Sequence, residues 1–137
     1  MRVAIVHFAV KNKILLQNIT RGLAQGIQAQ GHIVDVIDGM TETDKKLTIY
    51  NYIAVGTEST SFFSGKISGK IKEYFANAGT LAGKMSFAYL LKSGFGTEKA
   101  LLSLMRVMEA QGMIIKTSEV FKDPEIAEII GKKLHVS

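Results

Sequence analysis

The stretch RVAIVHFAVKNKILL, residues 2–16, decides the fold class of this chain. It begins with a continuous apolar run from Val3 to Val6, which is typical of a strand covered on both faces of a parallel sheet. It then opens a segment whose apolar residues recur every four positions and predict the buried face of a helix: Leu15, Ile19, Leu23 and Ile27. A strand that leads directly into an amphipathic helix is the repeating unit of α/β folds.

The same alternation continues along the chain. Further strands are predicted at residues 32–37, 50–56, 85–91 and 113–116. Further helices are predicted by three sets of apolar residues: Ile67, Ile71 and Phe75; Leu101, Leu102, Met105 and Met108; and Ile126, Ile129, Ile130 and Leu134. Because strands that alternate with helices pair in parallel through right-handed crossovers, we expect a single α/β domain over residues 1–137. Its expected architecture is a three-layer open sheet of five parallel strands in the order 2-1-3-4-5.

Several residues predict where helices begin and end. Gly31 and Gly112 each follow an apolar stripe and fit the position just after a helix C-terminus. The Asp-Pro pair at residues 123–124 predicts the start of the last helix, with Asp as N-cap. Thr97 is the corresponding N-cap candidate before the third long helix. The tandem SGKI at residues 64–71 has a period of one helical turn and predicts a helix face.

The composition excludes several classes of functional site. The chain has no cysteine, which excludes disulfides, thiolate metal sites, iron–sulfur clusters and thiol catalysis. Its histidines, His7, His32 and His135, show no metal-ligand spacing and accompany no G-x-S-x-G elbow, so we predict neither a metal site nor a catalytic residue. His7 is interpreted as a polar residue at a strand end.

Charge and hydropathy indicate the broad class of protein. The chain carries 17 basic and 12 acidic residues, a net charge of +5, which favours anionic partners through steering. It has no basic run interleaved with aromatic residues, so we predict a solvated basic surface and no nucleic-acid partner. No apolar run approaches the roughly 20 residues of a membrane span. The N-terminal apolar run is short and interrupted by His7, unlike a signal peptide, so we expect a cytoplasmic protein.

Three loops are predicted to meet at the ligand-binding end of this sheet. In open parallel sheets, ligands bind beyond the carboxyl ends of the strands, where the strand order reverses. Here the reversal lies between the first and third strands and brings together residues 7–13, 56–65 and 91–98. The first loop precedes a helix N-terminus, where backbone amides attract anions. It holds no Gly, Ser or Thr, and its two lysines are the groups that could attract an anion instead.

The other two loops combine aromatic residues with glycine. In the second loop, GTESTSFFSG, Phe62 or Phe63 could offer a face for a planar heteroaromatic ring, or both could cap the core beneath the loop. The third loop, LKSGFGTEK, places Phe95 between Gly94 and Gly96. It is either a helix start that attracts an anion or an ordinary strand–helix turn.

With these features, the run from Ala54 to Gly112 resembles the flavodoxin-like family, which comprises FMN-binding flavodoxins and NAD(P)H:quinone-reductase-like proteins. The shared elements are the loop GTESTSFFSG, the sequence LAGK before the fourth strand, the loop LKSGFGTEK and a helix that ends EAQGM. The resemblance implies a flavodoxin-like fold with FMN bound across the three loops. The phosphate loop is atypical: relatives hold the FMN phosphate on a Ser/Thr-rich segment with a G-N-T core, and the aligned triplet here is Lys11-Asn12-Lys13.

The resemblance also implies which residues contact the cofactor. On the first loop they are Phe8, Lys11, Asn12 and Lys13. On the second loop they are Thr57, Ser59, Ser61, Phe62 and Phe63, and on the third loop Ser93, Gly94 and Phe95.

Two functions from different classes follow. The first is an FMN protein of electron transfer or quinone-type reduction, either an oxidoreductase or a non-enzymatic electron carrier, in which the flavin supplies the chemistry. Its partners would be a redox protein or a small quinone-like acceptor, and the resemblance leaves monomer and homodimer open. The second is a flavodoxin-fold binding or regulatory module that has lost or weakened FMN binding. The altered first loop motivates it, because losing two or three hydroxyl contacts to a phosphate would weaken binding by roughly 5 kcal/mol.

Overall fold

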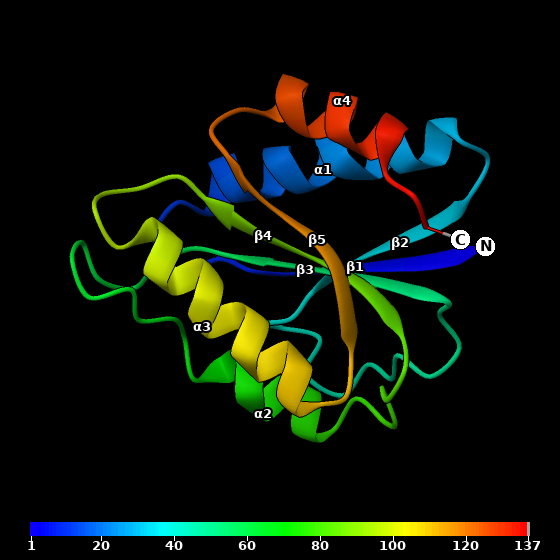
Figure 1. The fold of residues 1–137 in the computed structure, drawn as a ribbon, viewed down its shortest axis with the longest axis horizontal. Helices are drawn as coiled ribbons and strands as arrows, with labels where there is room; N and C mark the ends of the chain where they lie inside the picture. Colours follow the sequence, from blue (N-terminus) through cyan, green and yellow to red (C-terminus); the bar gives the residue numbers. More distant parts are fainter. Residues whose placement is uncertain (137) are drawn as a thin grey trace.

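The computed structural model describes residues 1–136, and Ser137, the last residue of the predicted domain, lies outside this range. The strands form one parallel sheet in the order β2-β1-β3-β4-β5, which confirms the predicted order. They are β1 (Arg2–Phe8), β2 (Ile33–Asp38), β3 (Tyr52–Thr57), β4 (Met85–Leu91) and β5 (Ile114–Phe121). The helices are α1 (Lys13–Ala29), α2 (Lys70–Ala76), α3 (Thr97–Ala110) and α4 (Pro124–Lys133). Figure 1 shows α1 and α4 on one face of the sheet and α2 and α3 on the other, which gives the three predicted layers.

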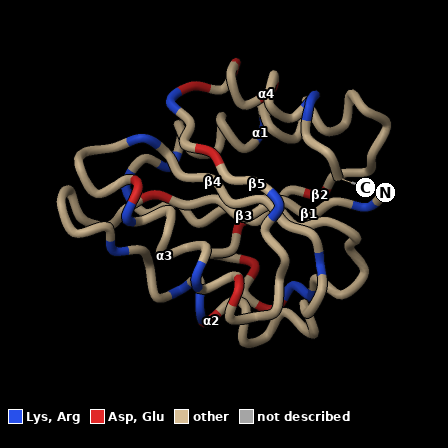
Figure 2. Tube along the Cα trace, in the orientation of Figure 1, with Lys and Arg blue, Asp and Glu red and all other residues tan. Residues whose placement is uncertain are grey.

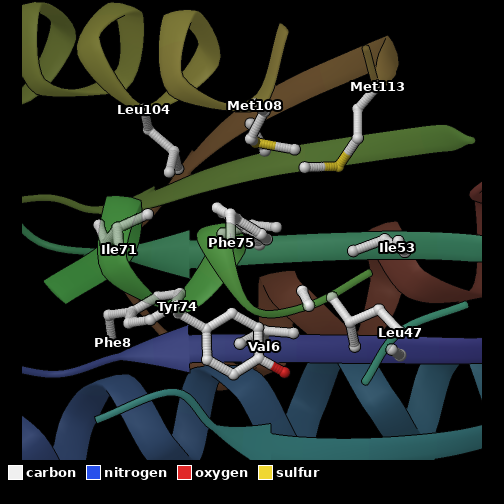
Figure 3. Close-up of a cluster of buried hydrophobic side chains, with 14 of the residues drawn as sticks. Val6, Phe8, Leu47, Ile53, Ile71, Tyr74, Phe75, Leu104, Met108 and Met113 are labelled. Atoms are coloured by element: carbon white, nitrogen blue, oxygen red, sulfur yellow. The ribbon is translucent and has the colours of Figure 1, made fainter. Parts of the chain in front are cut away.

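Alternate side chains of β1 build the two halves of the hydrophobic core. Val3 and Ile5 pack in the cluster under α1 and α4, whereas Val6 and Phe8 pack in the cluster under α2 and α3. Figure 3 shows the second cluster, in which the ring of Phe8 lies beside Tyr74 and other residues of α2. Because helices cover both faces, β1, β3 and β4 are buried along nearly their whole length.

Helices α1 and α4 approach so closely that glycines form the contact. A Cβ built on Gly26 would lie 2.2 Å from the carbonyl oxygen of Glu128, and one on Gly131 would lie 2.5 Å from that of Leu23. Gly22 meets the start of α4 in the same way, with its Cβ position 2.4 Å from the carbonyl oxygen of Pro124. Backbone therefore packs directly against backbone along this pair of helices.

This close contact overturns the predicted buried face of the last helix. Ile126 and Ile129 are about half exposed, whereas Ala127 and Gly131 are buried against α1. The prediction selected large apolar residues, but a contact between two backbones admits only small ones. The other two predicted residues do contribute to the core: Ile130 is partly buried and packs against it, and Leu134, just beyond the end of α4, is buried.

Two other predicted helix faces are slightly displaced. On α1, Leu15 is exposed and its neighbour Leu16 is buried, while the rest of the predicted stripe is buried as expected. On α3, Leu102 is exposed, and the buried face runs through Ala100, Leu104 and Met108. Since successive residues are about 100° apart around a helix, an error of one or two positions is enough to move a side chain off the buried face.

Some of the predicted helix ends are confirmed by the structure, and others are wrong. Gly31 and Gly112 follow α1 and α3 with φ of 95° and 85°, as predicted. Asp123 caps α4 as predicted, and its Oδ1 accepts a 3.0 Å hydrogen bond from the amide of Ile126. The helix face predicted for the tandem at residues 64–71 is wrong up to residue 69, because α2 begins only at Lys70, while Ile71 and Phe75 are buried on α2 as predicted.

Strand β5 is longer than residues 113–116 and ends at Phe121. It is an edge strand, so its polar residues can face solvent while they continue the pairing with β4. No helix within residues 1–136 combines the length and the apolar character needed to cross a bilayer.

Candidate functional site

The three predicted loops do meet at the carboxyl ends of β1, β3 and β4. Together they enclose a cavity of about 190 Å³. Its walls are formed by Lys11, Asn12, Glu58, Ser59, Ser61, Phe62 and Ser93. Six of these residues are among the predicted cofactor contacts, and Glu58 is the addition. The cavity is smaller than the roughly 300–1,000 Å³ of typical ligand pockets.

A larger hollow of about 350 Å³ lies elsewhere, beside the start of β4 and the segment that follows α4. Its walls are mostly apolar and include Met85, Thr117 and Leu134. Ligands of open parallel sheets bind at the carboxyl ends of the strands, so the cavity between the three loops is the candidate site.

The first loop is organised around the carboxylate of Glu58, which follows β3. One carboxylate oxygen accepts hydrogen bonds from the backbone amides of Val10, at 2.7 Å, Lys11, at 2.9 Å, and Asn12, at 3.1 Å. The other oxygen accepts a 3.0 Å hydrogen bond from the side-chain amide of Asn12. The side chain of Glu58 is fully buried. Three successive amides directed at one anion form a backbone anion site, and here a side chain of the same chain fills it.

This role of Glu58 was not predicted from the sequence. The signal that could have indicated it is the combination of two features: a first loop without any hydroxyl side chain and a carboxylate directly after β3. In the parallel sheet, Thr57 pairs with Phe8, so the residue after Thr57 stands opposite the start of the first loop. A buried carboxylate at this point needs donors, and the loop amides are the nearest ones.

An exposed cluster of three phenylalanines lies where the second and third loops meet. Phe62, Phe63 and Phe95 are 55%, 67% and 79% exposed. The rings of Phe63 and Phe95 are stacked, with centroids 5.8 Å apart and planes 12° apart, and Phe62 lies edge-on to both. The alternative that Phe62 and Phe63 cap the core is therefore wrong, since both rings are more than half exposed.

Backbone contacts hold the second and third loops together under this cluster. The carbonyl oxygen of Phe62 accepts 3.0 Å hydrogen bonds from the amides of both Phe95 and Gly96. Gly94 has φ of 55°, and a Cβ built on it would lie 2.7 Å from the ring of Phe62, so only glycine fits this turn. The predicted N-cap role of Thr97 is wrong: Gly96 holds the N-cap position, and the hydroxyl of Thr97 bonds the backbone of Ser93.

Some predicted contact residues are buried and engaged inside the protein. Phe8 is fully buried against Tyr74 and Phe75, so its side chain does not reach the cavity, contrary to the prediction. Thr57 is also fully buried, and its hydroxyl donates a 2.7 Å hydrogen bond to the carbonyl oxygen of Phe8. Ser59 borders the cavity, but its hydroxyl is directed at backbone carbonyls of its own loop.

The lysines of the first loop differ in position. Lys11 borders both the cavity and an open surface groove, whereas Lys13, the first residue of α1, borders the groove and is not part of the cavity wall. Figure 2 shows that lysine and arginine residues are spread over many elements and interspersed with acidic residues. No group of His, Asp and Glu side chains within residues 1–136 is arranged to hold a metal ion.

The first loop does not fit the phosphate of FMN in this arrangement. The amides of Val10, Lys11 and Asn12 are already committed to the carboxylate of Glu58. A phosphate in the same place would lack these donors and would face a like charge. The second and third loops differ from the first, because their exposed phenylalanine cluster suits a flat aromatic group.

Comparisons with known proteins identify the fold. No protein-family model matches the chain, and no curated protein matches it in sequence. Among solved structures, it is similar to a short-chain flavodoxin associated with a non-canonical PDU bacterial microcompartment, with TM-score 0.74, 11% identity and coverage of 98% of this chain and 97% of that one. It is also similar to the two-electron reduced flavodoxin of Megasphaera elsdenii, with TM-score 0.72, 14% identity and coverage of 95% and 96%.

A third similar structure is the flavodoxin of Streptococcus pneumoniae TIGR4, with TM-score 0.70, 18% identity and coverage of 96% of this chain and 97% of that one. The chain therefore has the flavodoxin-like fold that the sequence predicts, over nearly its whole length. At these low identities the likeness extends to the fold, and the ligand has to be argued from the residues at the site.

Proposed function

We propose that this flavodoxin-fold chain is a binding module that takes a flat aromatic ring of the flavin class at its crevice, with FMN binding weakened. This is the second of the two functions that the sequence suggests. The observation that carries it is the cluster of Phe62, Phe63 and Phe95, three aromatic residues that are each more than half exposed in the loops at the switch point of the sheet. The weakening follows from the first loop, whose amides are engaged by Glu58.

Binding of a flavin ring would also give the protein a redox role. The similar protein of Megasphaera elsdenii is a flavodoxin in its two-electron reduced form. Because the folds are alike, we propose that a flavin ring in the crevice would transfer electrons to a redox partner protein or to a small quinone-like acceptor. We also propose that a second copy of the chain could cover the exposed phenylalanines. As part of this proposal, we retain the prediction from the sequence that the protein is cytoplasmic.

The absorption spectrum of the freshly purified protein is the first test. We expect a nearly colourless protein, because a ligand held without a phosphate anchor is lost during purification. Titration with riboflavin, followed by flavin fluorescence, should then show saturable quenching. A yellow protein that retains stoichiometric FMN would support the tightly bound FMN carrier instead, and a protein that quenches neither riboflavin nor FMN would refute ring binding.

Variants of the phenylalanine cluster test where the ring lies. Phe95→Ala removes one stacked face and should weaken riboflavin binding by about two- to tenfold, since an aromatic pair contributes roughly 0.5–1.5 kcal/mol. Leu102→Ala is the matched control, because Leu102 is an exposed apolar residue of α3 outside the cavity wall. Equal riboflavin affinity in the two variants would place the ring elsewhere.

A further inference from the structure

The anion site of the first loop is complete without any external ligand. The carboxylate of Glu58 receives three successive backbone amides and the side-chain amide of Asn12, at distances from 2.7 to 3.2 Å. Glu58 has no exposed surface, although it forms part of the cavity wall. A buried carboxylate needs such donors, and this arrangement supplies them.

An external phosphate and Glu58 would compete for the same donors. Both are oxyanions, and both are bound by convergent N–H groups. The amides of Val10, Lys11 and Asn12 cannot serve a phosphate while they serve the carboxylate, and the two negative charges repel each other at contact distance. Glu58 therefore acts as a built-in occupant of the position that would otherwise bind a phosphate.

We propose that Glu58 is a specificity-determining residue that excludes phosphate from the crevice and selects ring ligands without a phosphate group, of the riboflavin class. The neutral part of the cavity wall agrees with this choice, because it includes Ser61 and Ser93, whose uncharged hydroxyl groups suit an uncharged polyol chain. The identity of the ring rests on the proposed function, whereas the exclusion of phosphate by Glu58 stands independently of it. The test therefore has one arm for each.

The first arm uses inorganic phosphate and requires no flavin. In ¹H–¹⁵N spectra of the whole protein, the amide signals of Val10, Lys11 and Asn12 should not move saturably when millimolar phosphate is added. In Glu58→Ala the same signals should move saturably, because the vacated amides can bind the anion. Glu58→Gln should give a smaller response, since its neutral oxygen still accepts from the loop. Glu98→Gln removes an exposed carboxylate from the first turn of α3 and is the matched control.

The second arm compares FMN with riboflavin by fluorescence titration. The wild-type protein should bind FMN no more tightly than riboflavin. In Glu58→Ala the ratio of the two affinities should shift by about tenfold or more in favour of FMN, because each hydrogen bond to a charged group contributes substantially to affinity. If Glu58→Ala is too unstable for these titrations, added phosphate should raise its midpoint of thermal unfolding by more than it raises that of the wild type.

Each result decides one of the two claims. Saturable movement of the three amides by phosphate in the wild type, or wild-type FMN binding at least about tenfold tighter than riboflavin binding, would overturn the role of Glu58. An unresponsive Glu58→Ala loop would overturn it as well. If no variant binds any flavin but the phosphate arm behaves as expected, the ring proposal fails and the exclusion of phosphate by Glu58 is supported.

Discussion

Asn12 donates two groups to Glu58, its backbone amide and its side-chain amide, and so connects the start of α1 to the end of β3. These residues are far apart in sequence and follow two strands, β1 and β3, that lie side by side in the sheet. Asn12 occupies the N-cap position of α1, but its side chain makes no capping hydrogen bond, because it serves the carboxylate instead of the helix amides. The loop between β1 and α1 is therefore held by an interaction across the sheet rather than by its own side chains.

The first prediction concerns the stability that Glu58 contributes. Glu58→Gln keeps the volume but removes the charge and places an NH₂ group among N–H donors. We expect a loss of roughly 2–4 kcal/mol in the free energy of unfolding, measured by urea denaturation at neutral pH. Glu98→Gln, an exposed control on α3, should change it by no more than about 0.5 kcal/mol. Equal losses in the two variants would contradict the buried network.

The second prediction concerns the contact between α1 and α4. Gly26→Ala should gain up to about 1 kcal/mol in helix propensity. It would also place a methyl group 2.2 Å from the carbonyl oxygen of Glu128, and backbone there cannot move aside as a flexible side chain can. We expect a net loss of roughly 1–3 kcal/mol in the free energy of unfolding. Gly69→Ala is the control, because a Cβ there meets nothing within 4 Å; a Gly26→Ala protein as stable as this control would refute the close packing.

The third prediction concerns a buried hydrogen bond beneath α1. The hydroxyls of Thr20 and Tyr89 lie 2.6 Å apart, and both residues are fully buried. Thr20→Val should leave the tyrosine hydroxyl without a partner and lower the free energy of unfolding by roughly 1–3 kcal/mol. Adding Tyr89→Phe to this variant removes the orphaned hydroxyl and should restore part of the loss. Additive losses in the double variant would show that the two hydroxyls do not interact.

The fourth prediction concerns pH. His7 is buried at the end of β1, and its Nδ1 has no hydrogen-bond partner within residues 1–136. Burial lowers the pKa of His7 below its ordinary value of 6.5, against the raising effect of the Asp38 and Glu42 carboxylates and with the smaller help of Arg21 and Lys13. The unfolded chain then binds more protons than the folded one as pH falls below about 6.5. The free energy of unfolding is therefore unaffected by the titration of His7 above that pH, and it decreases progressively as pH falls toward the pKa of His7 in the folded state.

His7→Gln tests this prediction, because it removes the titrating group. Its free energy of unfolding should fall less steeply than that of the wild type between about pH 7 and pH 5, measured by urea denaturation at several pH values. His135→Gln, at an exposed position, controls for the loss of a histidine. A constant difference between wild type and His7→Gln across this range would rule out His7 as the source of the pH dependence.

Much of the fold could be predicted because it depends on local patterns. The buried strands appear as apolar runs, and the residues at 85–91 match β4. Patterns of large apolar residues gave wrong predictions where packing depends on a segment that is distant in the sequence. The buried face of α4 is determined by the glycines of α1, and the sequence of α4 alone does not indicate that those glycines are its partners. The extent of β5 was missed for a related reason, since an edge strand tolerates polar residues.

The candidate site was predicted less completely than the fold. Its location follows from the strand order, and Phe62 and Phe95 lie in the loops expected to form it. The burial of Phe8 and Thr57 could not be read from the loop sequence, because it depends on how α2 and β3 pack against β1. Glu58 was missed because its donors are backbone amides, which leave no signature in the side chains of the loop.

The glycine contact between α1 and α4 has a consequence for synthesis in the cell. About 100 residues separate the two helices, and at roughly 5–20 residues per second α1 would leave the ribosome about 5–20 seconds before α4. During that interval the glycine-lined side of the nascent α1 stays uncovered. The layer formed by α1 and α4 therefore cannot be completed until the chain has been synthesised as far as α4.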